Sequence, residues 1–570
     1  MTNRSLLLIT GVLITAILCG CSSMSKNGAR PSWDGKMVVR DYPEDKEKSD
    51  SANQSQYRPE NYEISGEVGS DMPASSGVVS QYDRMSVAPS GHEEPTIYPV
   101  PPGQSNEPYD LTFFESYGVN PFINTQDDTF STFGMDVDTA SYTIARRFLQ
   151  DGNLPNKDSI RTEEFINYFD QNYPLADEVF GINVEGARSR FGDENYHLLK
   201  IGIKANDVSI YNRKPANLVF VVDVSGSMAR EERLEQVKRS LRTLAESLKQ
   251  DDRVALVVYG STGQVISDLT SNRDSIFRAI DQLRTGGSTN AGEGLRLAYD
   301  IADRGYDSKK INRIILCSDG VANTGITDAD RIIDQIKSEA RKGITLTTIG
   351  FGMGNYNDVL MEKLANHGDG SYFYIDNQQE ADRVFGNGTV AMIQAVAMDA
   401  KIQVEFNENI VNSFRLLGYE NRRLNKEDFE DDSVDAGEVG AGQTVTALYE
   451  ISLKDKAIDN PSATVAQVRI RYKNADVDRI EKNEKSIKVR DVTNEFNSSS
   501  PKFRFTAAVA EFAEILKESY WAKDGSLEDV LTVANGSVDM YEADEKEKEF
   551  IELVERAKML SVDKLAKEWQ

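Results

Sequence analysis

Three short segments rich in oxygen donors lie in the middle of the sequence. They are residues 223–227 (DVSGS), 286–289 (GGST) and 318–320 (SDG). Their donors are carboxylates and hydroxyls, without histidine or thiolate. Such hard ligands select Mg²⁺, Mn²⁺ or Ca²⁺ over zinc or copper. The segments therefore predict a site for one divalent cation.

A strand-then-helix pattern between residues 215 and 395 positions these segments. Strand-like runs such as NLVFVVDVS and RIILC are continuously apolar, which is typical of strands buried on both faces of a mostly parallel sheet. Helical runs such as ERLEQVKRSLRTLAESL separate them. The pattern predicts a doubly wound α/β domain, which binds ligands at the carboxyl ends of its strands. Two segments follow strands and the third precedes a helix, so three loops can converge there.

The spacing of the first segment requires a turn in the chain. Alternate residues of a regular strand share a face but lie about 6 to 7 Å apart. Asp223, Ser225 and Ser227 therefore reach one ion only if the chain bends sharply, and Gly226 permits such a bend.

With this spacing, the DVSGS segment together with Thr289 and Asp319 resembles the metal-ion-dependent adhesion site of von Willebrand factor A domains. The resemblance implies a Rossmann-like fold and a bound Mg²⁺, or else Mn²⁺ or Ca²⁺. It implies that Ser225, Ser227 and Thr289 are hydroxyl ligands and that Asp223 and Asp319 hold the ion directly or through water. It also implies an open coordination position, which an exposed Asp or Glu of a partner protein completes.

The flanks carry a second resemblance. The segments STFGMDVDTASY, EEFINYFDQNYP, GEVGAGQTVTALYEI and PKFRFTAAVAEFAEILKES are similar to regions that accompany the A domain in a bacterial lipoprotein family of undefined molecular role. The resemblance covers residues from about 110 to about 565, with Gly134 standing where the pattern has serine.

The expected layout of the chain has seven parts. It comprises a signal peptide at 1–20, lipidated Cys21 and a disordered tether at 21–108, an N-terminal helical region at 109–178, strands at 179–213, the A domain at 214–397, strands at 398–492 and a helical region at 493–570. Strands 179–213 are too few to be stable alone. We therefore hypothesise that they pair with strands 398–492 in one β-sandwich, into which the α/β domain is inserted.

The N-terminus predicts export. Arg4 precedes an apolar run at residues 6–18, which is too short for a membrane span and is typical of a secretory signal. The run Leu18-Cys19-Gly20-Cys21 resembles the bacterial lipobox, which implies lipidation of Cys21 and a place in the bacterial cell envelope. Ser22 favours the outer over the inner membrane, if the host sorts lipoproteins as enteric bacteria do. An uncleaved anchor or an ordinary cleaved signal would equally place the protein outside the cytoplasm.

Composition and motifs argue against two other function classes. The chain has 65 Lys+Arg against 92 Asp+Glu, a net charge of -27, which disfavours nucleic acid as a partner. Its three histidines offer no Ser-His-Asp arrangement. Asp136-Val137-Asp138-Thr139 matches the D-x-D-x-T of phosphotransferases, but no buried strand is predicted before it, so turn formation and helix capping are expected.

These observations predict a non-catalytic, metal-dependent adhesion or assembly module. A structural envelope scaffold, in which the metal only adds stability, is the alternative. A hydrolase is less favoured. The remaining cysteine, Cys317, is expected to be a buried and inert thiol.

Overall fold

The computed structural model describes residues 112–135, 137–175, 178–192, 195–320, 329–353, 356–455, 457, 459–539 and 544–568. The predicted signal peptide, Cys21 and the tether lie outside the described residues. All described residues belong to one compact unit, residues 95–570. Across these described ranges, no helix combines the length and apolar character needed to cross a membrane.

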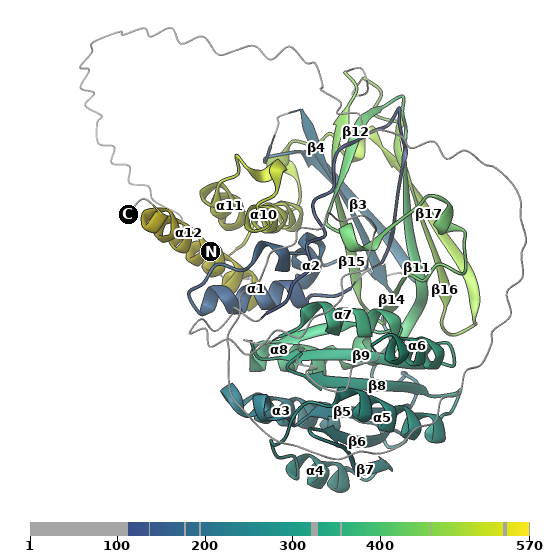
Figure 1. Cartoon of the computed structure of the whole chain (residues 1–570). Coiled ribbons are helices and arrows are strands. Elements are labelled where there is room, and N and C mark those ends of the chain that lie inside the picture. The colour runs from purple at the N-terminus through teal and green to yellow at the C-terminus, as the bar shows by residue number, and fades with distance from the viewer. Residues whose placement is uncertain are drawn as a thin grey trace, which may run out of the picture. The chain divides into compact units, whose positions relative to one another are not determined.

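A six-stranded sheet forms the centre of the α/β domain, in the order β10-β9-β8-β5-β6-β7 (Figure 1). Its strands are β5 (Ala216–Asp223), β6 (Arg253–Tyr259), β7 (Gly263–Thr270), β8 (Ile311–Ser318), β9 (Ile344–Phe351) and β10 (Tyr372–Ile375). Neighbouring strands are parallel except for the edge pair β6–β7. Every residue of β5 is buried, which explains its continuously apolar sequence. The predicted α/β fold is confirmed.

Helices cover both faces of this sheet. One face packs against α3 (Arg233–Glu246), α4 (Arg273–Asp281), α8 (Gln378–Asp382) and α9 (Thr389–Ile393). The other packs against α5 (Ala291–Gly305), α6 (Ala329–Ala340) and α7 (Asp358–His367). Helix α1 (Ala140–Gln150), which precedes the domain in sequence, adds Ile144 and Phe148 to this second face. Cys317 lies inside the domain as a fully buried thiol, as predicted.

Two further sheets share one hydrophobic core. The first has the order β1-β12-β15-β4-β3 and the second β13-β2-β11-β16-β17, with β14 also paired to β11. Their strands are β1 (Ile123–Asn124), β2 (Phe130–Gly134), β3 (Phe180–Arg188), β4 (Tyr196–Ala205), β11 (Ala395–Phe406), β12 (Val411–Leu417), β13 (Arg423–Leu424), β14 (Gly437–Gly440), β15 (Thr444–Leu453), β16 (Thr464–Asn474) and β17 (Arg479–Lys488). Strand β4 pairs with β15 along its length, so one sheet joins strands from both sides of the α/β domain.

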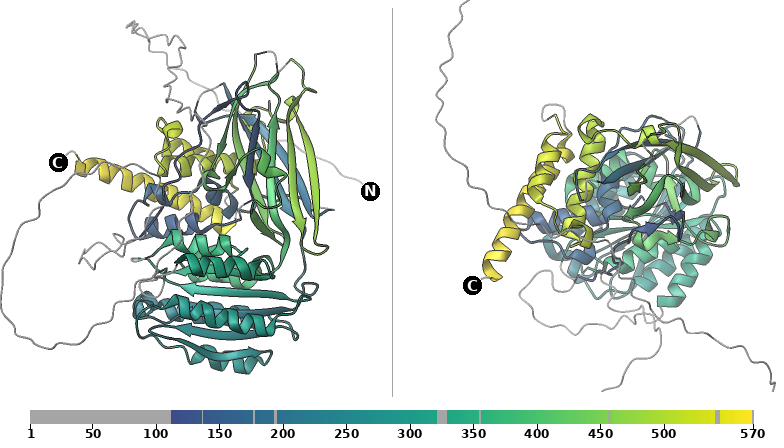
Figure 2. Two further views of the ribbon diagram at one scale, coloured as in Figure 1. Left: turned by 45° about the vertical axis from the view of Figure 1, so that its right-hand side comes forward. Right: turned by 90° about the horizontal axis from the view of Figure 1, so that it is seen from above.

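Helices from both ends of the described chain form a fourth cluster, seen in Figure 2. They are α1, α2 (Thr162–Tyr168), α10 (Pro501–Leu516), α11 (Leu527–Asn535) and α12 (Glu545–Glu568). Phe169 lies 5.1 Å from Phe505 and Phe512 lies 5.4 Å from Phe550 between ring centroids. Leu198 of β4 and Leu448 of β15 belong to the same core, so this cluster covers the outer face of the first sheet.

Short helical turns complete the described chain. They are η1 (Lys157–Ser159), η2 (Gly226–Glu232), η3 (Arg383–Asn387), η4 (Glu420–Arg422), η5 (Glu427–Phe429), η6 (Val489–Asp491), η7 (Phe496–Ser498) and η8 (Tyr520–Ala522).

The structure differs from the expected layout at two places. The region 109–178, expected to be helical, also supplies strands β1 and β2. Strand β2 is only five residues long and exists through its pairing with β11 and β13, which local sequence does not reveal. Strand β11 begins at Ala395, inside the span 214–397 assigned to the A domain.

Candidate metal site

The first predicted segment bends around the carboxylate of Asp223. Asp223 ends β5 and is fully buried. The backbone N–H of Ser225 donates to its Oδ1 at 2.8 Å, and the hydroxyl of Ser318, at the end of β8, donates to its Oδ2 at 3.1 Å. The hydroxyl oxygens of Ser225 and Ser227 lie 2.9 Å apart. The bend that the spacing requires is therefore present, and it brings these donors together.

Backbone hydrogen bonds join the second segment to the first. The N–H of Gly226 donates to the carbonyl of Gly287 at 3.1 Å, and the N–H of Gly286 donates to the carbonyl of Val224 at 2.6 Å. Thr289, two residues further along this loop, is 6% exposed. The loop that carries Thr289 therefore lies directly against the DVSGS loop.

The two carboxylate oxygens of Asp319, in the third segment, have different surroundings. Its Oδ2 accepts a hydrogen bond from Nη1 of Arg233 at 3.0 Å. Its Oδ1 is buried and has no hydrogen-bond partner among the described residues. Its neighbour Ser318 contacts Asp223, so the three loops converge. A buried carboxylate oxygen left without a donor is costly and is a natural position for a cation.

The two buried aspartates destabilise one another. Burial is the main cause that raises the pKa of Asp223 to about 7, and the nearby charge of Asp319 raises it further. A divalent cation between the two would offset both effects. The described residues include no cluster of three or more Asp, Glu, His or Cys side chains placed to hold a metal. A cation here therefore depends on serine and threonine hydroxyls, and the donor set suits Mg²⁺, Mn²⁺ or Ca²⁺.

Sequence reasoning missed Arg233. Its guanidinium is 4% exposed and also donates to the carbonyl of Met353. The available signal was its place in the first turn of the helix that follows DVSGS, where a cation faces the positive end of the helix dipole. A residue at such an unfavourable position needs a buried acid as its partner.

The aspartates of the D-x-D-x-T match have a different environment. The argument against a phosphotransferase rested on the absence of a preceding strand, and this was wrong, because β2 ends at Gly134. Asp138 is buried, and its Oδ1 accepts the N–H of Tyr372 at 2.8 Å while its Oδ2 accepts from Arg422 at 3.3 Å. Asp136 lies outside the described residues. Asp138 therefore joins the β-sandwich to β10 as a structural group.

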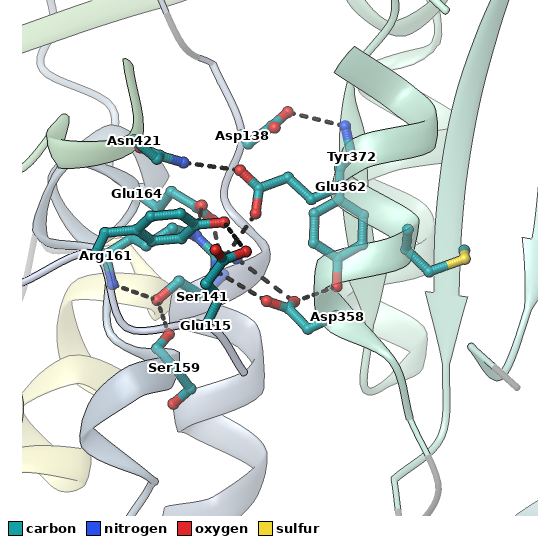
Figure 3. A network of polar contacts seen from close by, with 12 residues as sticks. Glu115, Asp138, Ser141, Ser159, Arg161, Glu164, Asp358, Glu362, Tyr372 and Asn421 are labelled. Carbon is teal, nitrogen blue, oxygen red and sulfur yellow. Dashed lines mark hydrogen bonds and ion pairs between the residues drawn. The ribbon is translucent and has the colours of Figure 1, made fainter. Parts of the chain in front are cut away.

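A buried polar network connects α2 to α7 near the site (Figure 3). Nη1 of Arg161 donates to Oδ2 of Asp358 at 2.9 Å and lies 3.7 Å from Oε2 of Glu362. Nε of Arg161 pairs with Glu164, whose other oxygen accepts the N–H of Ser141 at 2.7 Å. One arginine thus holds three buried carboxylates from two helices.

The network continues toward Asp319. The hydroxyl of Tyr372 donates to Oδ1 of Asp358 at 2.7 Å and lies 2.7 Å from the hydroxyl of Tyr356. Tyr356 packs on Gly320, where an added Cβ would lie 2.6 Å from its ring. The residue that follows Asp319 therefore touches the far end of the network.

Three family models match successive parts of the chain. Residues 109–200 match the model described as von Willebrand factor, residues 217–387 match von Willebrand factor type A domain, and residues 391–560 match Uncharacterized protein YfbK, C-terminal. The sequence is 36% identical over 443 residues to Uncharacterized protein YfbK of Escherichia coli (strain K12), covering 73% of this chain and 76% of that protein.

The chain is also similar to more distant proteins. The chain is 28% identical over 172 residues to inter-alpha-trypsin inhibitor heavy chain H1 of Sus scrofa, covering 28% of this chain and 19% of that protein. A solved von Willebrand factor type A structure from Catenulispora acidiphila is 15% identical, with a TM-score of 0.38 and coverage of 65% of this chain and 88% of that one.

Proposed function

Because this chain belongs to the family of YfbK and contains a von Willebrand factor type A domain, we propose that it binds a partner protein through a divalent cation. In this proposal Ser225, Ser227 and Thr289 supply hydroxyl ligands, while Asp223 and Asp319 hold the ion directly or through water. The ion, Mg²⁺ or else Mn²⁺ or Ca²⁺, supplies a Lewis-acidic position for an Asp or Glu of the partner. The role is recognition, not catalysis.

The Oδ1 of Asp319, buried and without a hydrogen-bond partner among the described residues, carries this proposal. Its carboxylate lies near that of Asp223, and backbone hydrogen bonds join the loop of Ser225 and Ser227 to the loop of Thr289. A preformed arrangement of this kind orders few groups on binding, which favours affinity.

The proposal includes the location of the module. Lipidated Cys21 would anchor the protein in the bacterial cell envelope, in the outer rather than the inner membrane, with residues 22–108 as a tether. In this proposal, the part of the protein that reaches the partner consists of the expected regions 109–178, 179–213, 214–397, 398–492 and 493–570.

Metal-dependent crosslinking in the native envelope tests the function. We expect Mg²⁺ to increase capture of a partner by the wild-type protein, and EDTA or Asp223→Asn to abolish it. Asp268→Asn removes an exposed carboxylate of β7 and serves as the matched control. Equal capture with and without metal, by wild type and Asp223→Asn alike, would contradict recognition through the ion.

The same variants separate recognition from the scaffold alternative. If the metal only stabilises the fold, Asp223→Asn lowers the thermal midpoint, while the fraction that remains folded captures the partner as well as wild type does. If the ion contacts the partner, the folded variant loses capture.

A further inference from the structure

Arg233 places a buried positive charge beside the candidate metal site. Its Nη1 lies 3.0 Å from Oδ2 of Asp319, and its Nη2 donates to the carbonyl of Met353. The side chain is 4% exposed, and the exposed acid Glu231 lies 3.8 Å away. The guanidinium is therefore fixed from two sides, with Asp319 as its nearest carboxylate.

The backbone near Arg233 fixes the position of its side chain. Glu231 and Glu232, just before α3, have φ of 50° and 54°, a left-handed conformation that is strained for residues other than glycine. The strained turn starts α3 with Arg233 pointing inward. Gly352 has φ of +77°, and an added Cβ there would lie 2.1 Å from Nε of Arg233. Gly352 thus leaves the space that the guanidinium fills.

This arrangement lowers the stability of the folded protein in two ways. A cation in the first turn of a helix faces the positive end of the helix dipole, and a buried charge loses its hydration. The strain and the two costs are localised at one side chain that contacts one predicted metal ligand. Strain concentrated next to a site is a feature of functional positions.

We infer that Arg233 is a specificity-determining residue of the metal site: its charge beside Asp319 makes the loaded site select a carboxylate. The inference rests on the proposed function. Its basis is the charge balance of the site. Asp223 and Asp319 carry two negative charges, which a divalent cation cancels. Arg233 adds one positive charge. The exposed carboxylate of Glu231, 3.8 Å away, offsets this charge only weakly because solvent screens it, so an incoming carboxylate neutralises the remainder.

This charge balance predicts that loss of Arg233 strengthens binding of the cation and weakens binding of the carboxylate. Without Arg233, the two aspartates attract the cation more strongly because no neighbouring charge repels it. The loaded site is then neutral, and its attraction for a carboxylate falls. If Arg233 had only a structural role, its loss would weaken binding of both the cation and the carboxylate. The two affinities therefore distinguish a structural role from a role in specificity.

Titration of the full chain with Mg²⁺ in equal concentrations of sodium acetate or sodium chloride tests this, with acetate as the carboxylate probe. For wild type we expect acetate to tighten Mg²⁺ binding, because two linked ligands strengthen one another. For Arg233→Met we expect Mg²⁺ alone to bind more tightly, by about fivefold or more, and the acetate effect to vanish. Arg233→Lys, which keeps the charge, should retain the acetate effect.

Controls make each outcome decisive. Arg239→Met removes an exposed charge from the same helix and should behave as wild type. Thermal unfolding without metal verifies that each variant is folded, and Arg233→Gln replaces Arg233→Met if the latter is not. An Arg233→Met protein with wild-type affinity and an intact acetate effect overturns the inference alone. Failure of the wild type to bind Mg²⁺, Mn²⁺ and Ca²⁺ alike overturns the proposed function and the inference together.

Discussion

Arg161, at the start of α2, donates to the carboxylate of Asp358, at the start of α7, across 2.9 Å. The side chains are 4% and 1% exposed. This buried pair ties the helical cluster to the α/β domain, close to Gly320, the residue after Asp319. Its contribution to stability can be tested by mutation.

We expect Arg161→Met to lower the free energy of unfolding by about 3–5 kcal/mol, because it removes the cation that pairs with the buried carboxylate of Asp358. Urea denaturation followed by circular dichroism measures the change. Arg188→Met removes an arginine that is half exposed and lies 4.0 Å from Glu495, so it should change stability by less than about 0.5 kcal/mol. Similar values for both variants would contradict the assigned role of the network.

Mg²⁺ should stabilise the folded protein. At a concentration about a hundred times its Kd, an ion that binds only the folded state adds about 2.7 kcal/mol to the free energy of unfolding. Differential scanning calorimetry should show a higher thermal midpoint with Mg²⁺ than with EDTA. The shift should be lost in Asp223→Asn and kept in Asp268→Asn, and a shift that persists in Asp223→Asn would place the ion elsewhere.

Glu511 of α10 makes the stability of the protein depend on pH. Burial, together with the neighbouring carboxylates Glu450 and Glu514, raises the pKa of Glu511 from 4.5 to about 8, against the opposing charge of Arg415. The unfolded chain releases this proton near pH 4.5 and the folded chain near pH 8, so the folded state binds more protons in between. Its contribution to stability therefore falls as pH rises through this window.

We expect Glu511→Gln to remove that fall. Urea midpoints measured at about pH 5 and about pH 8 should differ less in the variant than in wild type. At about pH 8 the variant should be more stable than wild type. Glu528→Gln, at an exposed position of α11, is the control. An unchanged difference between the two pH values would refute the assignment to Glu511.

Helix α1 should stabilise the α/β domain that follows it. Ile144 is fully buried against the second face of the parallel sheet. Ile144→Ala should cost about 2–5 kcal/mol through lost burial and a cavity, and amides of β5 and β8 should exchange with solvent faster. Val477→Ala, at an exposed position, should leave both unchanged. Faster exchange confined to α1 would show that the domain is independent of it.

The parts of the fold that were predictable from sequence have local signals. Strand β5 is buried on both faces and reads as an unbroken apolar run, and the DVSGS segment follows it directly. By contrast, β1 and β13 contain two residues each and exist only through distant partners. No sequence period indicates that Ile144 packs on a sheet formed more than seventy residues later, beginning at Ala216.

The candidate site divides in the same way. The residues of the motif are recognisable by type and spacing, whereas the contact of Arg233 with Asp319 spans three strands and the helices between them. A charge-bearing residue outside the motif carries no local signature except its unfavourable place at a helix start. Tertiary structure alone assigns its partner.

The pairing of β4 with β15 constrains how the chain is made. Residues 206–443 separate the two strands, so the ribosome completes the whole α/β domain before β15 exists. During that interval β4 has only β3 beside it and an open edge on the other side, where another nascent chain can pair and aggregate. Chains truncated after the α/β domain would retain this open edge permanently, and we expect them to require chaperones or to be degraded.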